Sequence, residues 1–431
     1  MQTFIKTYGC TLNQADSDIM EGLLSAEGIT AAGSMDAADV VIVNTCTVKT
    51  PTEQKVLHEL AKLEHAGKRV VVAGCMASAN GDLVKKYAPG ASIVTTSNVH
   101  RIVSAVREAA AGRRVVLDTY SKNDKLAFPM ARGAVVVKVP VSEGCLSSCA
   151  FCETKFARGP LNSFSEDRIV NAVKAGAGGG AREVQLTSQD MGAYGLDNKT
   201  DIAALMERLG SIEGDFRVRV GMLNPEHLHK YMDRFTAALQ GGRFYRFVHL
   251  PVQSGSDRVL GDMKRGYSAG QVAGYFRELR RAMPDVTIET DIIVGYPSET
   301  EEDFGMTLDF VRDARPNVVN MCKFWARPHA AASRLKQLPT EVILSRSAEL
   351  GRVVRAVQRG INETFIGRTC DITITEQEGD SISGRTDTYK KVILKAGRGV
   401  GIGADAAVRI TGASCNVLYA APLAEVEAVV V

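Results

Sequence analysis

Short hydrophobic runs alternate with amphipathic stretches over the first quarter of the chain. The runs 3–8, 39–44 and 68–73 are rich in β-branched residues, while 15–27 and 52–65 mix polar and apolar positions as helices do. Strands separated by a helix's worth of residues form βαβ units with a parallel sheet. Residues 1–120 are therefore predicted to form one α/β domain around a parallel sheet.

The same alternation continues with longer units over residues 132–340. The predicted strands are 134–141, 183–187, 216–222, 245–252, 286–293 and 318–324. The predicted helices between them are 167–175, 201–209, 227–239, 271–283 and 301–312. Six β/α units favour a partial, open (β/α)6 barrel with its chemistry at the C-terminal strand ends, and a doubly wound sheet is the alternative.

The pattern changes after one long helix predicted at 341–365. The runs 370–376, 381–386, 391–394 and 407–410 are short and β-rich, and Gly and Asp interrupt them without intervening helices. Residues 366–431 are therefore predicted to form a small all-β barrel. The fold class is α/β, with a Rossmann-like N-terminal domain, a central partial barrel and this β module.

Composition places the chain among globular proteins. Its 431 residues are 45% hydrophobic, and its apolar runs are far shorter than the roughly 20 residues that a membrane span needs. Because the N-terminus lacks a signal-peptide pattern, we expect a cytoplasmic protein without a membrane partner. We also expect a monomer. Nine cysteines in a reducing compartment indicate metal binding or catalysis before disulfides.

The most specific motif is a C-x3-C-x2-C run formed by Cys145, Cys149 and Cys152. It directly follows the first predicted barrel strand. Three thiolates on one loop can bind three irons of a [4Fe–4S] cluster and leave the fourth open to a substrate, as in radical S-adenosylmethionine (SAM) enzymes. A zinc loop or a set of buried thiols is the alternative, but no fourth Cys or His lies nearby to close a zinc site.

Three further cysteines each follow a predicted strand of the N-terminal domain. They are Cys10, Cys46 and Cys75. Since the C-terminal ends of parallel strands share one edge of a sheet, these thiols can converge. Each could also be a buried core residue, as could Cys322, Cys370 and Cys415, which we interpret as structural. Because Cys10, Cys46 and Cys75 all occupy the same position after a strand, a second iron–sulfur cluster is the favoured interpretation for them.

These motifs resemble the methylthiotransferase family. The resemblance runs in family order through YGCTLNQADS at 8–17, NTC at 44–46, GC at 74–75, LPVQSGS at 250–256 and TDIIVGYP at 290–297. The C-terminal module resembles the TRAM domain, a small RNA-binding barrel. Where the family usually has Pro-Arg-Pro-Gly-Thr-Pro, only Arg327 and Pro328 remain, which leaves the shape of that loop open.

The resemblance implies two [4Fe–4S] clusters and SAM. The cluster on Cys145, Cys149 and Cys152 would reduce SAM to release a 5′-deoxyadenosyl radical. The cluster on Cys10, Cys46 and Cys75 would carry the sulfur that is methylated and inserted. No catalytic side chain is assigned beyond the clusters, because the cofactors carry the chemistry. A reductant protein such as ferredoxin or flavodoxin is the expected electron donor.

Polar and aromatic residues near the predicted strand ends are candidates for binding SAM. They are Phe151, Gln189, Asp190, Gln253, Ser254, Asp291 and Tyr296. The polar residues could equally cap backbone groups. Arg158, after the cluster loop, either contacts a carboxylate or phosphate or is solvated.

The basic C-terminal module indicates an RNA substrate. Its candidate RNA contacts are Arg368, Arg385, Tyr389, Lys390 and Lys391, which could neutralise phosphates or stack on a base, although a solvated basic face is the alternative. Residues 11–17 most resemble the archaeal and eukaryotic branch, which implies N6-threonylcarbamoyladenosine beside the tRNA anticodon as substrate. The alternatives are N6-isopentenyladenosine in tRNA, a ribosomal-protein aspartate, or a non-catalytic iron–sulfur RNA-binding or electron-transfer protein.

Overall fold

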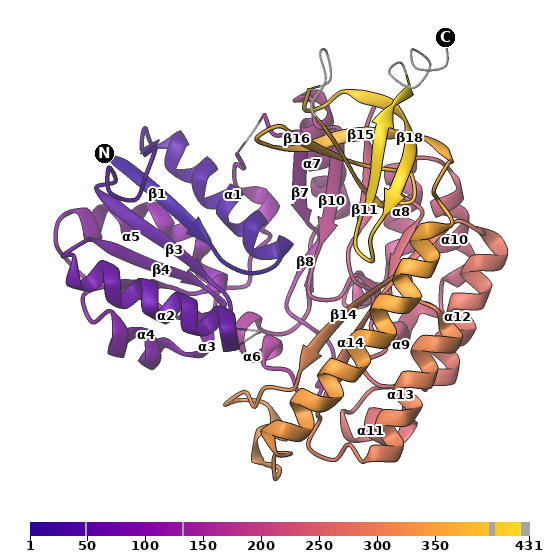
Figure 1. The fold of residues 1–431 in the computed structure, drawn as a ribbon. Helices are drawn as coiled ribbons and strands as arrows, with labels where there is room; N and C mark the ends of the chain where they lie inside the picture. The colour runs from indigo at the N-terminus through magenta and orange to yellow at the C-terminus, as the bar shows by residue number, and fades with distance from the viewer. Residues whose placement is uncertain (48–49, 132, 396–400, 424–431) are drawn as a thin grey trace.

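The computed structural model describes residues 1–431 except 48–49, 132, 396–400 and 424–431 (Figure 1). Its N-terminal domain contains a six-stranded sheet of order β2-β1-β3-β4-β5-β6, and every pairing in it is parallel. The strands are β1 (Gln2–Thr7), β2 (Thr30–Ala31), β3 (Val40–Thr45), β4 (Val70–Gly74), β5 (Ser92–Val94) and β6 (Val116–Leu117). The helices are α1 (Thr11–Ala26), α2 (Thr50–His65), α3 (Cys75–Ala79), α4 (Gly81–Tyr87) and α5 (Ile102–Ala110). The predicted parallel sheet is confirmed.

Six parallel strands form the central barrel in chain order. They are β7 (Val136–Pro140), β10 (Glu183–Thr187), β11 (Arg217–Val220), β12 (Phe247–His249), β13 (Thr287–Val294) and β14 (Val318–Lys323). They pair as β11-β10-β7 and β12-β13-β14, and a parallel bridge between Val218 and Phe244 joins the two sets. This order confirms the partial barrel and rules out the doubly wound alternative, in which the strand order would reverse. A short antiparallel pair, β8 (Ser142–Glu143) with β9 (Asn162–Ser163), flanks the first strand.

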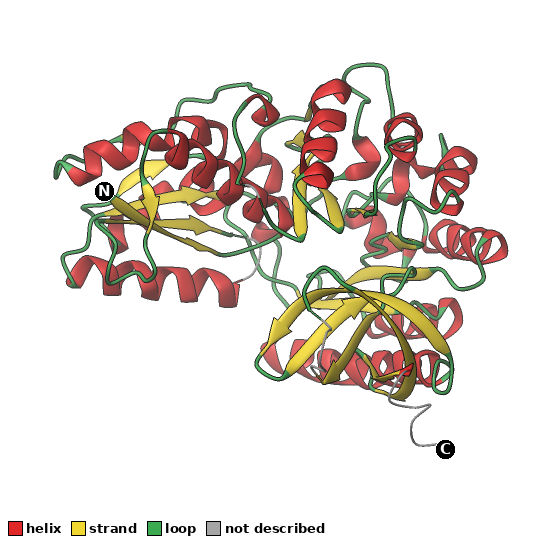
Figure 2. Ribbon diagram, turned by 90° about the horizontal axis from the view of Figure 1, so that it is seen from above, coloured by secondary structure: helices red, strands yellow, loops and turns green. Residues whose placement is uncertain are grey.

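Helices cover the outside of this barrel (Figure 2). The helices of the central domain are α6 (Thr154–Arg158), α7 (Glu166–Gly178), α8 (Ile202–Gly210), α9 (Pro225–Leu228), α10 (Met232–Gln240), α11 (Asp257–Asp262), α12 (Ala269–Ala282) and α13 (Glu301–Ala314). Of these, α6 packs against α3 at the junction with the N-terminal domain. The single helix predicted at 227–239 is wrong. The chain breaks at Tyr231, whose φ is −143° and whose buried hydroxyl donates to the Gly192 carbonyl oxygen at 2.9 Å.

The barrel strands turn apolar residues outward and polar residues inward. Val184, Val218, Val248 and Ile288 are fully buried in the core between strands and helices. Their neighbours in sequence face the lumen, and these are Gln185, Arg219, His249 and Glu289. A (β/α) barrel that only packs its interior fills it with bulky branched residues. This charged lumen is instead suited to binding a polar molecule.

A long helix, α14 (Thr340–Glu363), leads to the C-terminal barrel. Five strands close it in the order β15-β16-β17-β19-β18. They are β15 (Thr369–Glu378), β16 (Ser381–Arg385), β17 (Lys391–Lys395), β18 (Asp405–Ala413) and β19 (Leu418–Pro422). The predicted small β-barrel is confirmed, with β19 as an additional strand.

One turn of the C-terminal barrel inserts into the central barrel. Tyr389, between β16 and β17, has a left-handed φ of 64°, which is unusual for a residue other than glycine. Its hydroxyl donates to the Glu183 carboxylate at 2.9 Å, and its ring packs against Tyr245 and Phe247 with centroids 4.8 and 5.0 Å away. These contacts offset the backbone strain and fix the C-terminal barrel against the strand starts. Among the described residues, no helix is long and apolar enough to cross a membrane.

Candidate functional site

The three N-terminal cysteines lie at one edge of the sheet. Cys10 follows β1 and begins α1, Cys46 follows β3, and Cys75 follows β4, which are neighbouring strands. The Asn13 Oδ1 atom lies 3.7 Å from the sulfur of Cys10 and 3.7 Å from that of Cys75. A Cβ on Gly9 would lie only 2.9 Å from the Cβ of Cys46, so glycine allows the first loop to reach that thiol. The structure thus brings together the predicted trio.

A buried guanidinium contacts this trio from the central domain. Arg158, at the end of α6, donates from Nε to the Cys75 sulfur at 3.2 Å and from Nη2 to Asn13 Oδ1 at 2.6 Å. Burial raises the pKa of the Cys75 thiol to about 12 although Arg158 opposes this, so the free site holds Cys75 as a thiol. Iron binding displaces such a proton, and an N–H donor to sulfur stabilises the ligated thiolate. The donor set therefore fits an iron–sulfur cluster.

Arg158 also belongs to a closed set of buried ion pairs. It pairs with Asp16 at 2.9 Å and Glu143 at 2.8 Å, and Lys125 pairs with each of the same carboxylates at 2.6 Å. Two cations and two carboxylates balance one another out of contact with water. Because Asp16 belongs to α1 and Glu143 to β8, the set joins the two domains beside the cysteines. Of the two interpretations left open for Arg158, contact with carboxylates is the one the structure supports.

The second trio lies on the loop between β8 and α6. Burial raises the pKa of Cys145 to about 12, and the nearby Asp190 adds to the shift. The Cys152 sulfur accepts the Thr154 N–H at 3.3 Å, and the Cys149 sulfur accepts a hydrogen bond from Arg265 at 3.0 Å. The three thiols with these N–H donors fit a cluster with an open iron.

Arg265 and Asn224 support that loop, and sequence reasoning missed both. Arg265 donates to Asn224 Oδ1 at 2.8 Å, and Asn224 donates to the Ser147 hydroxyl at 3.1 Å. Neither residue lies near a cysteine in the sequence, and neither forms a spacing pattern. Only the barrel places them beside the loop.

We expect Arg265→Gln to slow SAM cleavage by about 10- to 100-fold, which is the usual effect of removing an outer partner of a metal ligand. The variant should still bind iron at both trios. Its rate of 5′-deoxyadenosine release and the reduction potential of the cluster would be measured against Arg277→Gln, an arginine of α12 with the same change of charge. Unchanged potential and rate would contradict this role for Arg265.

The end of β10 carries the strongest candidates for binding SAM. Three buried polar atoms there have no hydrogen-bond partner among the described residues, namely Ser188 Oγ, Gln189 Oε1 and Asp190 Oδ2. Buried polar atoms are rarely left unpaired in folded proteins, so this edge fits a polar ligand. The other Asp190 oxygen, Oδ1, accepts from the backbone N–H groups of Gly192 and Asn224 at 2.8 and 2.9 Å.

The remaining SAM candidates have structural partners. Tyr296 is fully buried, packs edge-on against Phe324 and donates to the Asp262 carbonyl oxygen at 3.0 Å, so its prediction as a SAM contact is not supported. Phe151 packs against the same apolar cluster. Ser254 accepts from the Ser256 N–H, and Gln253 has a φ of 73° in a bridge to β13.

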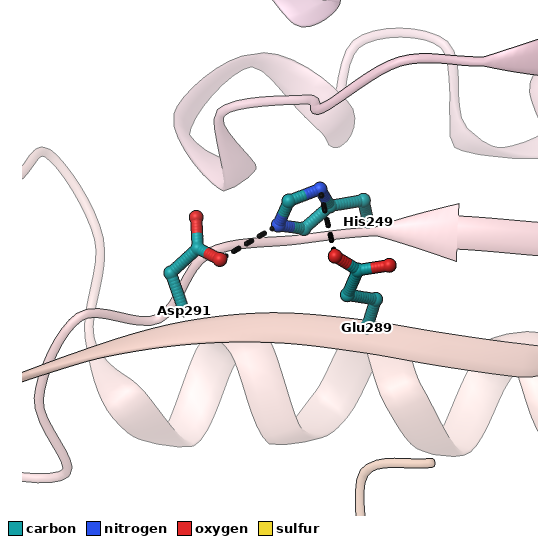
Figure 3. A group of neighbouring side chains, drawn as sticks. All are labelled: His249, Glu289 and Asp291. Carbon is teal, nitrogen blue, oxygen red and sulfur yellow. Dashed lines mark hydrogen bonds and ion pairs between the residues drawn. The ribbon is translucent and has the colours of Figure 1, made fainter. Parts of the chain in front are cut away.

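Asp291 faces the lumen within a polar group (Figure 3). His249 contacts Asp291 through Nε2 at 3.0 Å and Glu289 through Nδ1 at 3.6 Å, and Asn320 donates to both carboxylates. Burial disfavours the charged imidazole, but Asp291 and Glu289 outweigh it and raise the pKa of His249. The two ring nitrogens face different carboxylates, which favours the charged imidazole. The ligand atoms of His249, Glu289 and Asp291 also lie within 4.8 Å of one another, close enough to hold one metal ion.

The candidate RNA contacts divide into exposed and buried residues. Arg368, Arg385 and Lys391 lie at the surface of the C-terminal barrel with acidic neighbours, Asp285 for the first and Glu376 for the other two. Tyr389 lies against the central barrel, and Lys390 is buried, with 7% of its surface exposed. The expectation that Tyr389 and Lys390 lie on an exposed RNA-binding face is therefore corrected, because both line a cavity between the two barrels. The inserted turn, which leaves no pattern in the sequence, is the reason.

Two family models match the chain. Residues 2–96 match "Uncharacterized protein family UPF0004" and residues 139–311 match "Radical SAM superfamily". The "Probable threonylcarbamoyladenosine tRNA methylthiotransferase" of Pyrococcus abyssi is 38% identical over 402 residues, which cover 92% of this chain and 94% of that protein. The "Threonylcarbamoyladenosine tRNA methylthiotransferase" of Drosophila melanogaster is 33% identical over 425 residues, covering 96% and 76%.

Solved structures share the fold at low sequence identity. The radical SAM methyltransferase TsrM from Kitasatospora setae, with cobalamin and a [4Fe–4S] cluster bound, superposes with a TM-score of 0.55 at 13% identity, covering 93% of this chain and 83% of that one. This likeness concerns the arrangement of the α/β domain and the barrel alone.

Proposed function

The chain belongs to the family of threonylcarbamoyladenosine tRNA methylthiotransferases, and on that premise we propose that it converts N6-threonylcarbamoyladenosine beside the tRNA anticodon to its 2-methylthio derivative. The observation that carries the proposal is the pair of cysteine trios. Arg158 contacts one trio directly and lies in the helix that follows the loop of the other. A single radical SAM loop would serve many reactions, whereas a second trio beside it supports sulfur insertion.

We propose two [4Fe–4S] clusters, one on Cys10, Cys46 and Cys75 and one on Cys145, Cys149 and Cys152. When bound, the clusters and SAM supply the radical and the sulfur. The protein's residues would position the clusters and SAM and shield them from solvent. Arg158 and Arg265 donate to one sulfur of each trio, and the polar atoms at the end of β10 are available to SAM.

The charged lumen and the C-terminal barrel would receive the RNA. Arg368 is exposed, and Arg385 and Lys391 are partly exposed, which supports contacts with RNA phosphates that do not depend on the base sequence. A reductant protein such as ferredoxin or flavodoxin is the proposed electron donor. A cytoplasmic location and a monomeric state stay predictions.

The decisive experiment uses the reconstituted protein with SAM, a strong reductant and tRNA that carries N6-threonylcarbamoyladenosine. Mass analysis of the digested tRNA should show the 2-methylthio nucleoside, and the mixture should contain 5′-deoxyadenosine. Modification of N6-isopentenyladenosine or of a ribosomal protein in its place would refute the substrate. Absence of 5′-deoxyadenosine would refute the enzyme and favour a non-catalytic iron–sulfur protein.

A further inference from the structure

A cavity of 550 Å³ lies where all three domains meet. Thr11 and Gln14 of α1 form one wall, and Thr11 directly follows the cysteine ligand Cys10. Lumen-facing Arg219 and Glu289 form the second wall, and Lys390 of the C-terminal barrel lies on the third. The cavity therefore lies between the barrel lumen, the C-terminal barrel and the start of α1, the helix that follows Cys10 of the first trio.

Two cations of this cavity, Arg219 and Lys390, have no counter-charge among the residues that the structure describes. Arg219 lies over the rings of Phe247 and Tyr389, 5.0 and 5.5 Å from their centroids. Its buried Nε has no hydrogen-bond partner, and neither Arg219 nor Lys390 has an ion-pair partner, within the described ranges. In the described part of the chain, the Lys390 ammonium donates to the neutral Asn362 amide oxygen at 2.9 Å. Lys390 is buried, and Arg219 is partly buried with an inaccessible Nε atom. Since buried charged groups in folded proteins are normally paired, these two side chains point to an anionic ligand.

The surrounding groups do not supply the missing charge. Glu289, the one carboxylate among the described residues of the cavity wall, is engaged by His249 and Asn320. Thr287 is buried, with 2% of its surface exposed, and it lines the cavity. Its hydroxyl has no hydrogen-bond partner in the described structure. An acceptor group placed here would therefore meet a hydroxyl donor as well as the cations.

A larger neighbouring cavity shows the contrast. Its volume is 700 Å³, and it lies between the same two barrels. Among its arginines, Arg182 pairs with Asp215 and Asp405, Arg246 with Asp387 and Arg368 with Asp285. Arg217 has no ion-pair partner among the described residues and donates to the Gly242 carbonyl oxygen at 3.3 Å. The larger cavity thus supplies acidic partners to most of its arginines, whereas Arg219 and Lys390 of the smaller cavity have none among the described residues.

We propose that this cavity binds the threonyl carboxylate of the substrate nucleoside, with Arg219 and Lys390 as its ligands. The inference rests on the proposed function and deepens it. Threonine joined through its nitrogen to a carbamoyl group keeps a free carboxylate, which a planar guanidinium binds through two parallel hydrogen bonds. An RNA phosphate offers the same chemistry. Arg219 faces the lumen, and the cavity wall includes Thr11, the residue after Cys10. Both observations favour the carboxylate of the modified nucleoside over a backbone phosphate as the anion.

The test compares three anticodon stem-loop RNAs on the reconstituted protein by equilibrium binding. One carries N6-threonylcarbamoyladenosine, one carries its uncharged carboxamide, and one carries unmodified adenosine. Wild type should bind the first roughly 10- to 100-fold more tightly than the carboxamide, the range of one charge-assisted contact. Arg219→Gln should remove that preference. Arg217→Gln, two residues earlier on the same strand and lining the larger cavity, should keep it.

Each outcome separates the possibilities. If Arg219→Gln weakens all three RNAs equally and lowers the salt dependence, the anion is a phosphate and the proposal is overturned. If Arg219→Gln prefers the RNA with the free carboxylate over the carboxamide RNA as strongly as wild type does, the cavity does not bind the carboxylate. In both cases wild type would still methylthiolate the tRNA. If wild type itself shows no methylthiolation, the proposed function fails first. Lys390→Gln, checked for folding by thermal unfolding, should reproduce the Arg219 result.

Discussion

Replacing Cys10, Cys46 and Cys75 together with alanine should halve the iron content and abolish methylthiolation while 5′-deoxyadenosine is still formed. The two trios lie on different domains, and each has its own N–H donor to sulfur, Arg158 for the first and Arg265 for the second. Loss of one set of thiolates therefore leaves the other intact. Iron analysis, 5′-deoxyadenosine release and nucleoside mass analysis would be measured on the same preparation.

Two matched variants give this experiment its controls. Alanine at Cys145, Cys149 and Cys152 should also halve the iron but should stop 5′-deoxyadenosine release altogether. Alanine at Cys322, Cys370 and Cys415 should change neither quantity, because these thiols lie apart from both trios. Normal methylthiolation by the first triple variant would show that the N-terminal thiols hold no cluster.

Arg158→Met should lower the free energy of unfolding by about 3–5 kcal/mol, the usual cost of leaving buried charges unpaired. The change removes one cation from the set with Lys125, so Asp16 and Glu143 keep a single positive partner between them. It also removes the donor to the Cys75 sulfur. The variant should therefore lose iron from the N-terminal trio first. Denaturant unfolding and iron spectroscopy would follow the two effects separately.

Arg107→Met is the matched control for that variant. Arg107 pairs with Glu27 at 2.7 Å on the surface, where both side chains are about half exposed. An exposed pair contributes roughly 0–1 kcal/mol, so this variant should unfold like wild type and keep its iron. An Arg158→Met protein as stable as Arg107→Met, with full iron, would show that the buried set is not needed at the domain junction.

The sequence was most informative where local patterns carry the fold. Strand-length apolar runs predicted the parallel sheet and the six barrel strands, and the position of three cysteines after neighbouring strands predicted their convergence. The helix at 227–239 was wrong because Tyr231 leaves the helical conformation, with φ −143° and ψ 17°, where its hydroxyl donates to the Gly192 carbonyl group. That contact joins segments far apart in the chain, and periodicity contains no information about it.

Long-range pairing also explains what was missed at the site. Arg158 lies 83 residues from Cys75, and Arg265 lies 116 residues from Cys149. Charge alone could not distinguish these buried arginines from solvated ones. The same limit misplaced Tyr389 and Lys390, because a basic segment with an aromatic residue is typical both of an RNA-binding face and of a turn inserted between domains.

The inserted turn that carries Tyr389 has a consequence for how a nucleotide is selected. Because its ring packs against Tyr245 and Phe247 and its hydroxyl donates to Glu183, a rotation of the C-terminal barrel about α14 would break these contacts. The contacts therefore favour one separation between the cations of the C-terminal barrel and the reaction centre. An RNA bound through its phosphates would place at the reaction centre the nucleotide that lies at that distance from the bound phosphates. The modified position would then be selected by its distance along the RNA and not by base sequence.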